Sequence, residues 1–410
     1  MPQFVPFRGI LYQAGQDGAD LSSLTAPPYD VIDEERRAQL EDLDPHNAVH
    51  LTLPRDDQPG DRYDRAGAML RAWLDDGTLR LDDAAAFYSY RVEFEDESGA
   101  SRVMHGVIGA LEVEPPDDGD VLPHERTMPK PKSDRLDLLR ATRANLEPIW
   151  GLTLTPGLTS LLDDEGVPAA RCVDTRGARH CLFRVTDPAR IEAISAAIAA
   201  TPLVIADGHH RYETSLRFRE EHDRPGPHDF IMCLVVELTN DELVVQPIHR
   251  VITHLGDTDL GTLVSDRFDV VELGPNDPET VERAAAAMAE RSAMALVDAR
   301  GVALLVARAE ELAPMLADEP SILGGVDATR FEAGLAPAIE QAGGEVAYRH
   351  GRQIVAALVR KGEADAAVLL RPVDADLIRQ AAEERIRMPQ KTTFFHPKPS
   401  TGLVIRSLDH

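Results

Sequence analysis

The feature that most constrains the fold is a buried-type strand that runs through a glycine directly into a helix. The apolar run at residues 202–206 is typical of a short buried strand. Residues 209–221 have a helical pattern, which the prolines and glycine of residues 223–227 bring to an end. Gly208 lies at the junction, where a residue without a Cβ permits a tight turn and a close backbone approach. The sequence therefore predicts a strand-to-helix turn at residues 207–211.

This turn places positive side chains where a helix least favours them. His209, His210 and Arg211 occupy the first helical turn, whose free N–H groups and dipole favour a negative charge. A bound phosphate or carboxylate would remove the conflict, so we interpret the turn as a candidate anion-binding site. A purely structural alternative is open, in which Asp207 caps the helix and Arg211 pairs with Glu213 or another carboxylate.

The net charge restricts the classes of partner. The chain has 410 residues, enough for two or three domains, and its formal net charge is −27. It lacks the basic excess with which proteins bind nucleic acids or anionic membranes, so we expect neither as a partner. Only five of its residues are lysines, and four of them fall in two short polar stretches: Lys130, Lys132, Lys391 and Lys398. A lysine in an arginine-rich chain suggests that its compact charge is needed there.

No segment of the sequence indicates secretion or a membrane span. The N-terminus has no basic region followed by an apolar segment, and no apolar run approaches about 18 residues. Cys172, Cys181 and Cys233 lack the paired spacing of metal ligands and indicate a reducing compartment. We therefore expect a cytoplasmic protein, whose oligomeric state the sequence leaves open.

The succession of elements predicts an α+β fold of several layers with mixed sheets. Residues 87–94 and 101–113 alternate around a polar turn and predict a β-hairpin. Residues 49–53 also alternate like a strand. We divide the chain into an N-terminal α+β region at residues 1–116, a central region with the Asp-Gly-His-His-Arg turn at 117–257, and a C-terminal α/β region with a docked tail at 258–410.

Two further polar stretches carry candidate functional residues. Residues 122–135 contain three prolines and combine Glu125 with two lysines, one of them Lys132. The tail at residues 388–405 contains Lys391 followed by two threonines, a group that could hold an anion. Each stretch has a structural alternative, namely a solvated basic loop for the first and a tail pinned by its adjacent phenylalanines for the second.

Six short motifs occur in chain order across nearly the whole sequence. They are PFRG at 6–9, APPYDVI at 26–32, PHERT at 123–127, ADGHHRYET at 206–214, PIHRV at 247–251 and MPQKTTFF at 388–395. Together they resemble the bacterial and archaeal family known as domain of unknown function 1015. The chain is identified as a member of that family, which by its name implies no activity.

The Asp-Gly-His-His-Arg turn at residues 207–211 is also similar to the phosphate-binding turn of the ParB and sulfiredoxin superfamily. That superfamily includes nucleotide-binding partition proteins, sulfiredoxins and a free-serine kinase. The resemblance is confined to the turn and its flanking elements. It implies a ParB/sulfiredoxin-like nucleotide-binding core in which His209, His210 and Arg211 bind phosphate and Gly208 permits its approach.

These observations lead to the hypothesis of a nucleotide-dependent phosphotransferase, a kinase acting on a small polar metabolite such as free serine. Phosphoryl transfer requires positive charge around the transferred group. Arg211 and His210, with Lys132 or Lys391, would supply that charge. On chemistry alone, two carboxylates are candidates for orienting the acceptor hydroxyl: Glu125 and Asp30.

The expected cofactors are Mg²⁺ and ATP or ADP, with the metal held by carboxylate oxygen from Asp207 or Glu125. One alternative is a regulatory protein that binds ATP or CTP without turning over a small molecule. Another is a metal-dependent hydrolase, although no two of its candidate ligands are spaced one helical turn apart. Those ligands would be His124, His209, His210 and His249.

Overall fold

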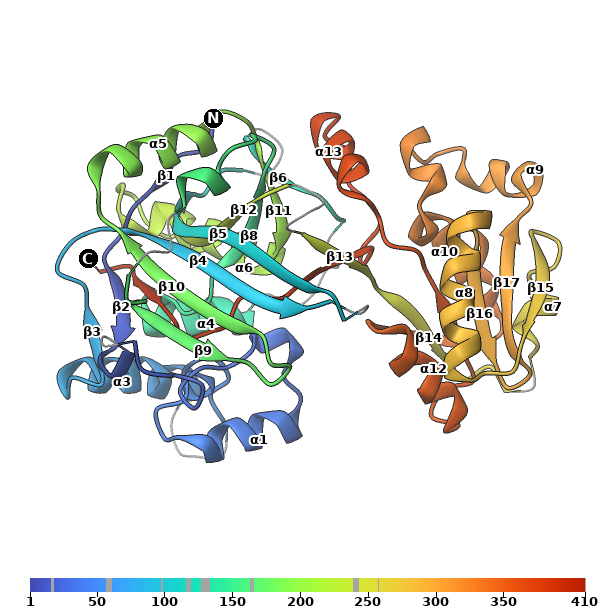
Figure 1. The fold of residues 1–410 in the computed structure, drawn as a ribbon, viewed down its shortest axis with the longest axis horizontal. Coiled ribbons are helices and arrows are strands. Elements are labelled where there is room, and N and C mark those ends of the chain that lie inside the picture. Colours follow the sequence, from blue (N-terminus) through green and yellow to red (C-terminus); the bar gives the residue numbers. More distant parts are fainter. Residues whose placement is uncertain are drawn as a thin grey trace. The chain divides into compact units, whose positions relative to one another are not determined.

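The computed structural model describes residues 1–15, 18–56, 61–96, 99–115, 119–126, 133–162, 166–238, 243–256 and 258–409. The chain forms two compact units (Figure 1). Unit 1 comprises Met1–Pro123, Thr127–Val244 and Pro397–His410, and unit 2 comprises His124–Arg126 and Val245–His396. These boundaries differ from the three regions expected from the sequence, because strands on both sides of residue 116 pair in one sheet and the tail contributes to both units.

The larger sheet of unit 1 has the order β6-β11-β8-β12-β5-β4-β10-β9, and β1 pairs with β5. Its strands are β1 (Phe4–Val5), β4 (Phe87–Glu95), β5 (Ser101–Glu112), β6 (Val121–Pro123), β8 (Ile149–Thr153), β9 (Ala170–Val173), β10 (Arg179–Val185), β11 (Leu203–Asp207) and β12 (Phe230–Glu237). The pair β4 and β5 is the hairpin predicted from the sequence. The sequences of strands β8, β11 and β12 are mainly apolar without alternation, because these strands are buried on both faces.

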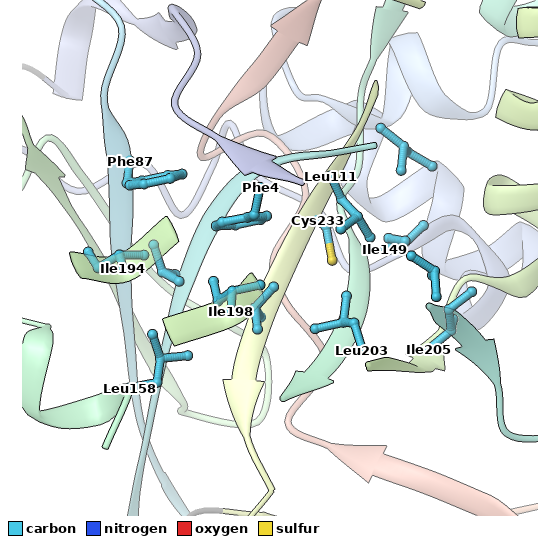
Figure 2. Close-up of a cluster of buried hydrophobic side chains, with 14 of the residues drawn as sticks. Phe4, Phe87, Leu111, Ile149, Leu158, Ile194, Ile198, Leu203, Ile205 and Cys233 are labelled. Atoms are coloured by element: carbon cyan, nitrogen blue, oxygen red, sulfur yellow. The ribbon is translucent and has the colours of Figure 1, made fainter. Parts of the chain in front are cut away.

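Helix α5 (Pro188–Ala199) packs on this sheet and completes the main core of unit 1. Figure 2 shows Ile194 and Ile198 of the helix pointing toward Phe4 and Phe87 of the strands. The rings of Phe4 and Phe87 stack with their centroids 5.0 Å apart. Ile205 of β11 belongs to the same cluster. The strand that leads into the Asp-Gly-His-His-Arg turn is therefore anchored in a close-packed core, which fixes the direction in which the turn leaves it.

A second sheet of unit 1 has the order β3-β2-β21-β7 and includes the chain's C-terminal strand. Its strands are β2 (Gly9–Tyr12), β3 (Leu79–Leu81), β7 (Ala144–Asn145) and β21 (Ile405–Ser407). The helices beside the two sheets include α1 (Glu34–Leu43), α2 (Val49–Thr52), α3 (Arg62–Asp75), α4 (Ser133–Thr142) and α6 (His209–Glu220). Pairing of β21 with β2 and β7 holds the tail in place.

Helix α2 corrects one expectation, because residues 49–53 were predicted to be a strand. The side-chain oxygen of Asn47 accepts a hydrogen bond of 2.9 Å from the backbone N–H of Val49 and starts a helical turn instead. Val49 and Leu51 are both buried. The strand prediction was wrong because so short an apolar alternation fits either a strand or one helical turn.

Unit 2 is built on an antiparallel sheet of the order β15-β17-β16-β19-β14-β18. Its strands are β14 (His249–Thr253), β15 (Phe268–Gly274), β16 (Met294–Asp298), β17 (Gly301–Ala307), β18 (Glu345–Arg349) and β19 (Ala366–Leu369). Its helices include α7 (Leu260–Leu263), α8 (Pro278–Arg291), α9 (Ala309–Leu312), α10 (Asp327–Gly334), α11 (Ala336–Gln341), α12 (Arg352–Arg360) and α13 (Ala375–Glu383). Apolar side chains of α8 and α12 form one core with those of the sheet.

A separate ribbon joins β13 (Val244–Pro247) to β20 (Thr393–His396). The structure thus confirms a fold of mixed α and β type with several sheets. Across the described part of the chain, no helix is both long enough and apolar enough to cross a membrane.

Candidate functional site

The turn between β11 and α6 has the backbone geometry that the sequence predicts. Gly208 has φ +91° and ψ 24°, a left-handed conformation that a residue with a Cβ adopts only under strain. A Cβ at this position would also lie 2.8 Å from Cγ2 of Ile149. No side chain caps the N-terminus of α6. Asp207 therefore does not cap this helix, whereas the other part of the structural alternative, the pairing of Arg211 with a carboxylate, is confirmed.

Arg211 turns back from α6 to the end of β11. Its Nη2 donates a hydrogen bond of 2.7 Å to Oδ2 of Asp207, and its Nη1 donates one of 2.5 Å to the carbonyl oxygen of Pro148. Nη1 also lies 3.6 Å from Oε2 of Glu147. Burial acts to lower the pKa of Arg211, but the carboxylates of Glu147 and Asp207 outweigh it and raise the pKa. The guanidinium is thus a charged group held inside the protein by an ion pair.

Lys398 approaches the same carboxylate from the tail. Its Nζ donates hydrogen bonds of 2.7 Å to Oδ2 of Asp30 and 2.8 Å to Oδ1 of Asp207. Only 10% of its side chain is exposed. Burial acts to lower the pKa of the ammonium group, but Asp207 and then Asp30 outweigh burial and raise it. For Asp207 burial acts to raise the pKa, and the nearby Lys398 and Arg211 hold it well below its usual value. Both groups are therefore charged at neutral pH.

Glu147 connects the chain segments that carry these residues. Its Oε1 accepts hydrogen bonds from the backbone N–H of Tyr29 at 3.0 Å and from the hydroxyl of Thr401 at 3.2 Å. Burial raises the pKa of Glu147, and the positive charge of Arg211 opposes this rise. Tyr29 precedes Asp30, and Thr401 lies close to Lys398 in sequence, so one carboxylate holds both segments at the turn. We call Asp30, Glu147, Asp207, Arg211 and Lys398 together the Lys398 cluster.

The two histidines lie at the start of α6 beside this cluster. His209 is near enough to contribute to the lowered pKa of Asp207. His210 is 39% exposed, and its Nδ1 lies 4.0 Å from Oε2 of Glu213. Asp30 is exposed to a similar extent, 37%. The accessible side of the cluster therefore presents a carboxylate and an imidazole next to the first turn of a helix.

Glu125 and Lys391, which the sequence suggested as base and phosphate ligand, lie in unit 2 and contact each other. Oε2 of Glu125 accepts a hydrogen bond from the backbone N–H of Lys391 at 2.8 Å. Oε1 accepts from the N–H groups of Thr392 and Thr393 at 3.1 and 2.9 Å and from the Thr393 hydroxyl at 2.8 Å. Lys391 has φ +56°, which turns successive N–H groups toward one anion. The anion at this segment is thus the carboxylate of Glu125.

Asp207 does not fit the role of a Mg²⁺ ligand that the sequence suggested. Each of its oxygens is already hydrogen-bonded to a cationic nitrogen, Nζ of Lys398 or Nη2 of Arg211. Within the described ranges, no group of three or more histidine, cysteine, aspartate or glutamate side chains is arranged to hold a metal ion. His249, proposed for a metal hydrolase, accepts the N–H of Leu370, and burial lowers its pKa to about 3.

Sequence reasoning found part of this site and missed the rest. Asp30, Asp207, Gly208, His209, His210 and Arg211 come together in unit 1, whereas Glu125 and Lys391 belong to unit 2. Lys132 lies outside the described residues. One feature of the sequence pointed to Lys398: the chain has only five lysines, and this one lies in the proline-rich tail. Glu147 had none, because a single glutamate between a helix and a strand resembles any surface residue.

Comparisons with known proteins identify the family and find solved structures of low similarity. A family model described as "Protein of unknown function (DUF1015)" matches residues 4–328. No curated protein matches the sequence. Among solved structures, a conserved hypothetical protein from Pyrococcus furiosus is 14% identical, with a TM-score of 0.39, over 75% of this chain and 97% of the other.

Two further solved structures are similar at the same level. A free serine kinase in complex with AMP is 15% identical, with a TM-score of 0.35, over 67% of this chain and 82% of its own. SbnI with a C-terminal truncation, from Staphylococcus aureus, is 11% identical, with a TM-score of 0.37, over 70% of this chain and 82% of its own. Similarity this low does not transfer an activity.

Proposed function

Because the chain belongs to the DUF1015 family of proteins of unknown function, membership assigns no activity, and we propose one from the geometry of unit 1. The proposal is a nucleotide-dependent phosphotransferase that moves a phosphoryl group to the hydroxyl of a small polar metabolite. Free serine is the first acceptor to test. The core around β11 and α6 would serve as a ParB/sulfiredoxin-like nucleotide-binding core, with ATP or ADP as the nucleotide.

The observation that carries the proposal is a buried lysine shared by two aspartates directly before a helix N-terminus. Burying the ammonium of Lys398 with the carboxylate of Asp207 costs free energy that apolar side chains of the same volume would avoid. The cluster also stands where Gly208 leaves the first N–H groups of α6 without a side-chain cap. Charged groups kept at such a position, with strongly shifted pKa values, favour a functional role over a structural one.

The residues of unit 1 divide into phosphate-binding groups and an acceptor-activating group. The N–H groups at the start of α6, with His209 and His210, would bind the nucleotide's phosphates. Lys398 would stabilise negative charge on the transferred group. The accessible carboxylate of Asp30, oriented by its hydrogen bond to Lys398, would bind the acceptor hydroxyl. Arg211 and Glu147 would hold Asp207 and the adjoining segments in position.

In this arrangement Asp30 receives the proton of the acceptor hydroxyl as its oxygen attacks the terminal phosphorus of the nucleotide. The new O–P bond forms while the bond from that phosphorus to the bridging oxygen of the nucleotide breaks. The nucleotide then leaves with one phosphate fewer. Since both oxygens of Asp207 are hydrogen-bonded to cationic nitrogens, no step is assigned to a metal held by this carboxylate.

The test separates binding from turnover. ATP, ADP and CTP should each be tried for thermal stabilisation of the full chain, where a ligand at about 100 times its Kd adds roughly 2.7 kcal/mol. His210→Gln should weaken the shift, whereas the control His254→Gln, at a 68% exposed histidine of unit 2, should not. Asp30→Asn should keep the shift but abolish phosphorylated product in an acceptor screen followed by ³¹P NMR.

Three outcomes are informative. A shift without product for any acceptor would support the regulatory alternative, in which the nucleotide binds without turnover. Retained product in Asp30→Asn would remove Asp30 from the proposed role. The absence of a shift with every nucleotide would overturn the nucleotide-binding proposal altogether.

A further inference from the structure

In the larger sheet of unit 1, three polar residues from neighbouring elements form a row. β10 pairs with β4 on one side and with β9 on the other (Figure 1). Tyr90 of β4 and His180 of β10 are buried, and Asp174 lies in the turn between β9 and β10. The Tyr90 hydroxyl lies 2.7 Å from Nδ1 of His180, and Nε2 of His180 lies 3.5 Å from Oδ2 of Asp174. We call these three residues the Tyr90 triad, which the proposed function does not use.

The tail determines the direction of the hydrogen bonds in this triad. Ser400 donates its backbone N–H to the hydroxyl oxygen of Tyr90 at 3.0 Å. A phenol has one proton to donate, and within the described part of the chain His180 is the only partner that can accept it. Tyr90 therefore donates to Nδ1 of His180. The neutral imidazole must then carry its own proton on Nε2, the nitrogen nearer to Asp174.

Asp174 favours this form of the imidazole. Its Oδ1 accepts the backbone N–H groups of Arg176 and Ala178 at 2.8 and 2.9 Å. Burial acts to raise the pKa of Asp174, but His180 and these N–H groups outweigh burial and lower the pKa. The side chain is thus a carboxylate at neutral pH, and its negative charge favours a proton on the facing Nε2. The turn after β9 therefore keeps Nδ1 available as the acceptor for Tyr90.

The N–H of Ser400 matters because the tail has few backbone donors at this place. Pro397 and Pro399 have no N–H, so residues 397–400 carry only those of Lys398 and Ser400. Proline also restricts its own φ to about −65°, so the position of Ser400 constrains that of Lys398 two residues before it. The ammonium group of Lys398 binds the two aspartates of the Lys398 cluster. A bond to Ser400 thus bears on the geometry of that cluster.

The other contacts of Ser400 are weaker, and the next anchor lies further along the tail. The Ser400 hydroxyl donates to the carbonyl oxygen of Ala26 at a long 3.4 Å and accepts from Sγ of Cys172, a weak donor, at 3.5 Å. Thr401 exchanges backbone hydrogen bonds of 3.1 and 2.8 Å with Ala26, which hold the chain beyond Ser400. Between that anchor and Lys398, the hydrogen bond to the triad fixes the backbone.

We propose that the Tyr90 triad consists of positioning residues, which hold Lys398 against Asp207 through the backbone N–H of Ser400. The triad touches neither a substrate nor the transferred group. Its bearing on phosphoryl transfer rests on the proposed function, because only that function gives Lys398 a part in the reaction. The positioning itself needs no ligand and can be measured on the full chain alone.

The first test measures the protection of the tail. Tyr90→Phe keeps the ring and removes the hydroxyl. In hydrogen exchange followed by mass spectrometry, peptides covering residues 395–404 should exchange faster by about fivefold to tenfold, the effect of one hydrogen bond. The control Tyr12→Phe removes another buried hydroxyl of unit 1, which donates to the carbonyl of His46, and should leave these peptides unchanged. Unchanged exchange in Tyr90→Phe would overturn the proposal.

The second test asks whether the triad acts on Lys398, which a hydrogen bond of purely local importance would not do. Lys398, Arg211 and His209 lower the pKa of Asp207, so a displaced lysine lets this pKa rise toward its usual value. The stability gained from the lowered pKa is present above the unfolded value and lost as the pH falls. Urea unfolding between pH 6 and pH 3 should therefore show a difference between wild type and Tyr90→Phe that becomes smaller at low pH. A constant difference, as expected for Tyr12→Phe, would contradict the link to Lys398.

Variants of His180 test the direction of the hydrogen bonds. His180→Asn retains an acceptor near the position of Nδ1 and should keep the protection of residues 395–404, whereas His180→Leu should lose it. Equal exchange in the two variants would overturn the role of His180. NMR of the wild type labelled with ¹⁵N-histidine should show the proton on Nε2, and a proton on Nδ1 would contradict the assigned direction.

The two proposals fail separately, because none of these measurements uses a nucleotide or an acceptor. Fast exchange and a changed acid profile in Tyr90→Phe, with no nucleotide binding by the wild type, would contradict only the proposed function. Nucleotide binding and phosphorylated product, with wild-type exchange in Tyr90→Phe, would contradict only this inference.

Discussion

The two lysines of the tail, Lys391 and Lys398, meet carboxylates in opposite ways. At Lys391 the backbone N–H groups of residues 391–393 bind Glu125, and the lysine side chain itself is exposed. At Lys398 the ammonium group binds two aspartates and is almost wholly buried. The first arrangement satisfies the N–H groups of residues 391–393 with one internal anion. The second holds charges of both signs beside an uncapped helix.

This difference shows that lysine content alone does not locate a phosphate site. Both lysines stood out in the sequence for the same reason, as rare ammonium groups in an arginine-rich chain. Only the tertiary structure shows that Lys391 binds a carboxylate through its backbone N–H, whereas Lys398 binds carboxylates through its ammonium group. The predictions below test that distinction. Trp73 and Trp150, the chain's two tryptophans, are both buried in unit 1, so their fluorescence reports on that unit.

The largest effect is expected from removing the buried ammonium. Lys398→Ala should lower the free energy of unfolding of unit 1 by about 3–5 kcal/mol, because it breaks a buried ion pair. Oδ1 of the mostly buried Asp207 then has no cationic partner, while Oδ2 keeps its hydrogen bond from Arg211. Asp30 contributes less, since more than a third of it is exposed. Lys391→Ala should change the stability by less than about 0.5 kcal/mol. Urea unfolding followed by tryptophan fluorescence measures the first loss, and equal losses in the two variants would contradict the comparison.

Gly208→Ala should have the next largest effect. The left-handed backbone costs about 1–2 kcal/mol for alanine, and the contact of its Cβ with Ile149 adds a cost of about 1–3 kcal/mol. Gly77→Ala is the matched control, because Gly77 has φ +81° and open space around its Cβ position. It should show the backbone cost alone. Similar losses in the two variants, measured by the same unfolding experiment, would mean that the turn does not require close packing.

Removing the carboxylate of Glu125 should lower the stability less than the two variants above, and the loss should be confined to unit 2. Glu125→Ala leaves the N–H groups of residues 391–393 without their acceptor, at a cost of about 1–3 kcal/mol. Hydrogen exchange followed by mass spectrometry should show faster exchange in peptides covering 388–396. Glu319→Ala, which removes only the ion pair with the exposed Arg126, is the control and should leave these peptides unchanged. Unchanged exchange in Glu125→Ala would argue against a structural role for this carboxylate.

The smallest expected effect is a difference in acid sensitivity. Lys398 and Arg211 lower the folded-state pKa of Asp207 below its unfolded value of about 3.9. The stability from this shift is complete above that value and is lost as the pH falls through the folded-state pKa. Glu147 has the opposite sign, because burial raises its pKa, so its contribution is present at low pH and lost as the pH rises.

Lys398→Met should therefore lose less stability than the wild type on acidification below about pH 4, by about 1 kcal/mol or more. The difference in free energy of unfolding between the wild type and the variant becomes smaller as the pH falls. Urea unfolding of both proteins between pH 6 and pH 3 measures this difference. Parallel pH profiles would show that Lys398 does not set the charge of Asp207.

Several local features of the molecule were predictable because they depend on neighbouring residues. The hairpin of β4 and β5 follows from alternation around a polar turn. The break between α10 and α11 falls just before Pro337, where a proline disrupts a helix. Asp33 caps α1 by accepting the N–H of Arg36, and aspartate is a common capping residue directly before a helix. The strand prediction at residues 49–53 was wrong because five residues carry too little periodicity to distinguish a strand from a helical turn.

The sequence by itself determined the strand-to-helix turn at Gly208 and the mixed α and β class, because backbone preferences and apolar periodicity act over short stretches of chain. Tertiary structure alone decided which charged groups meet. Asp30 and Lys398 are 368 residues apart in sequence, and Glu125 and Lys391 are 266 apart, yet each pair is in contact. Whether a carboxylate faces an ammonium group, a backbone N–H or solvent depends on how distant segments pack. That packing makes Glu125 part of the framework and places Lys398 at the candidate site.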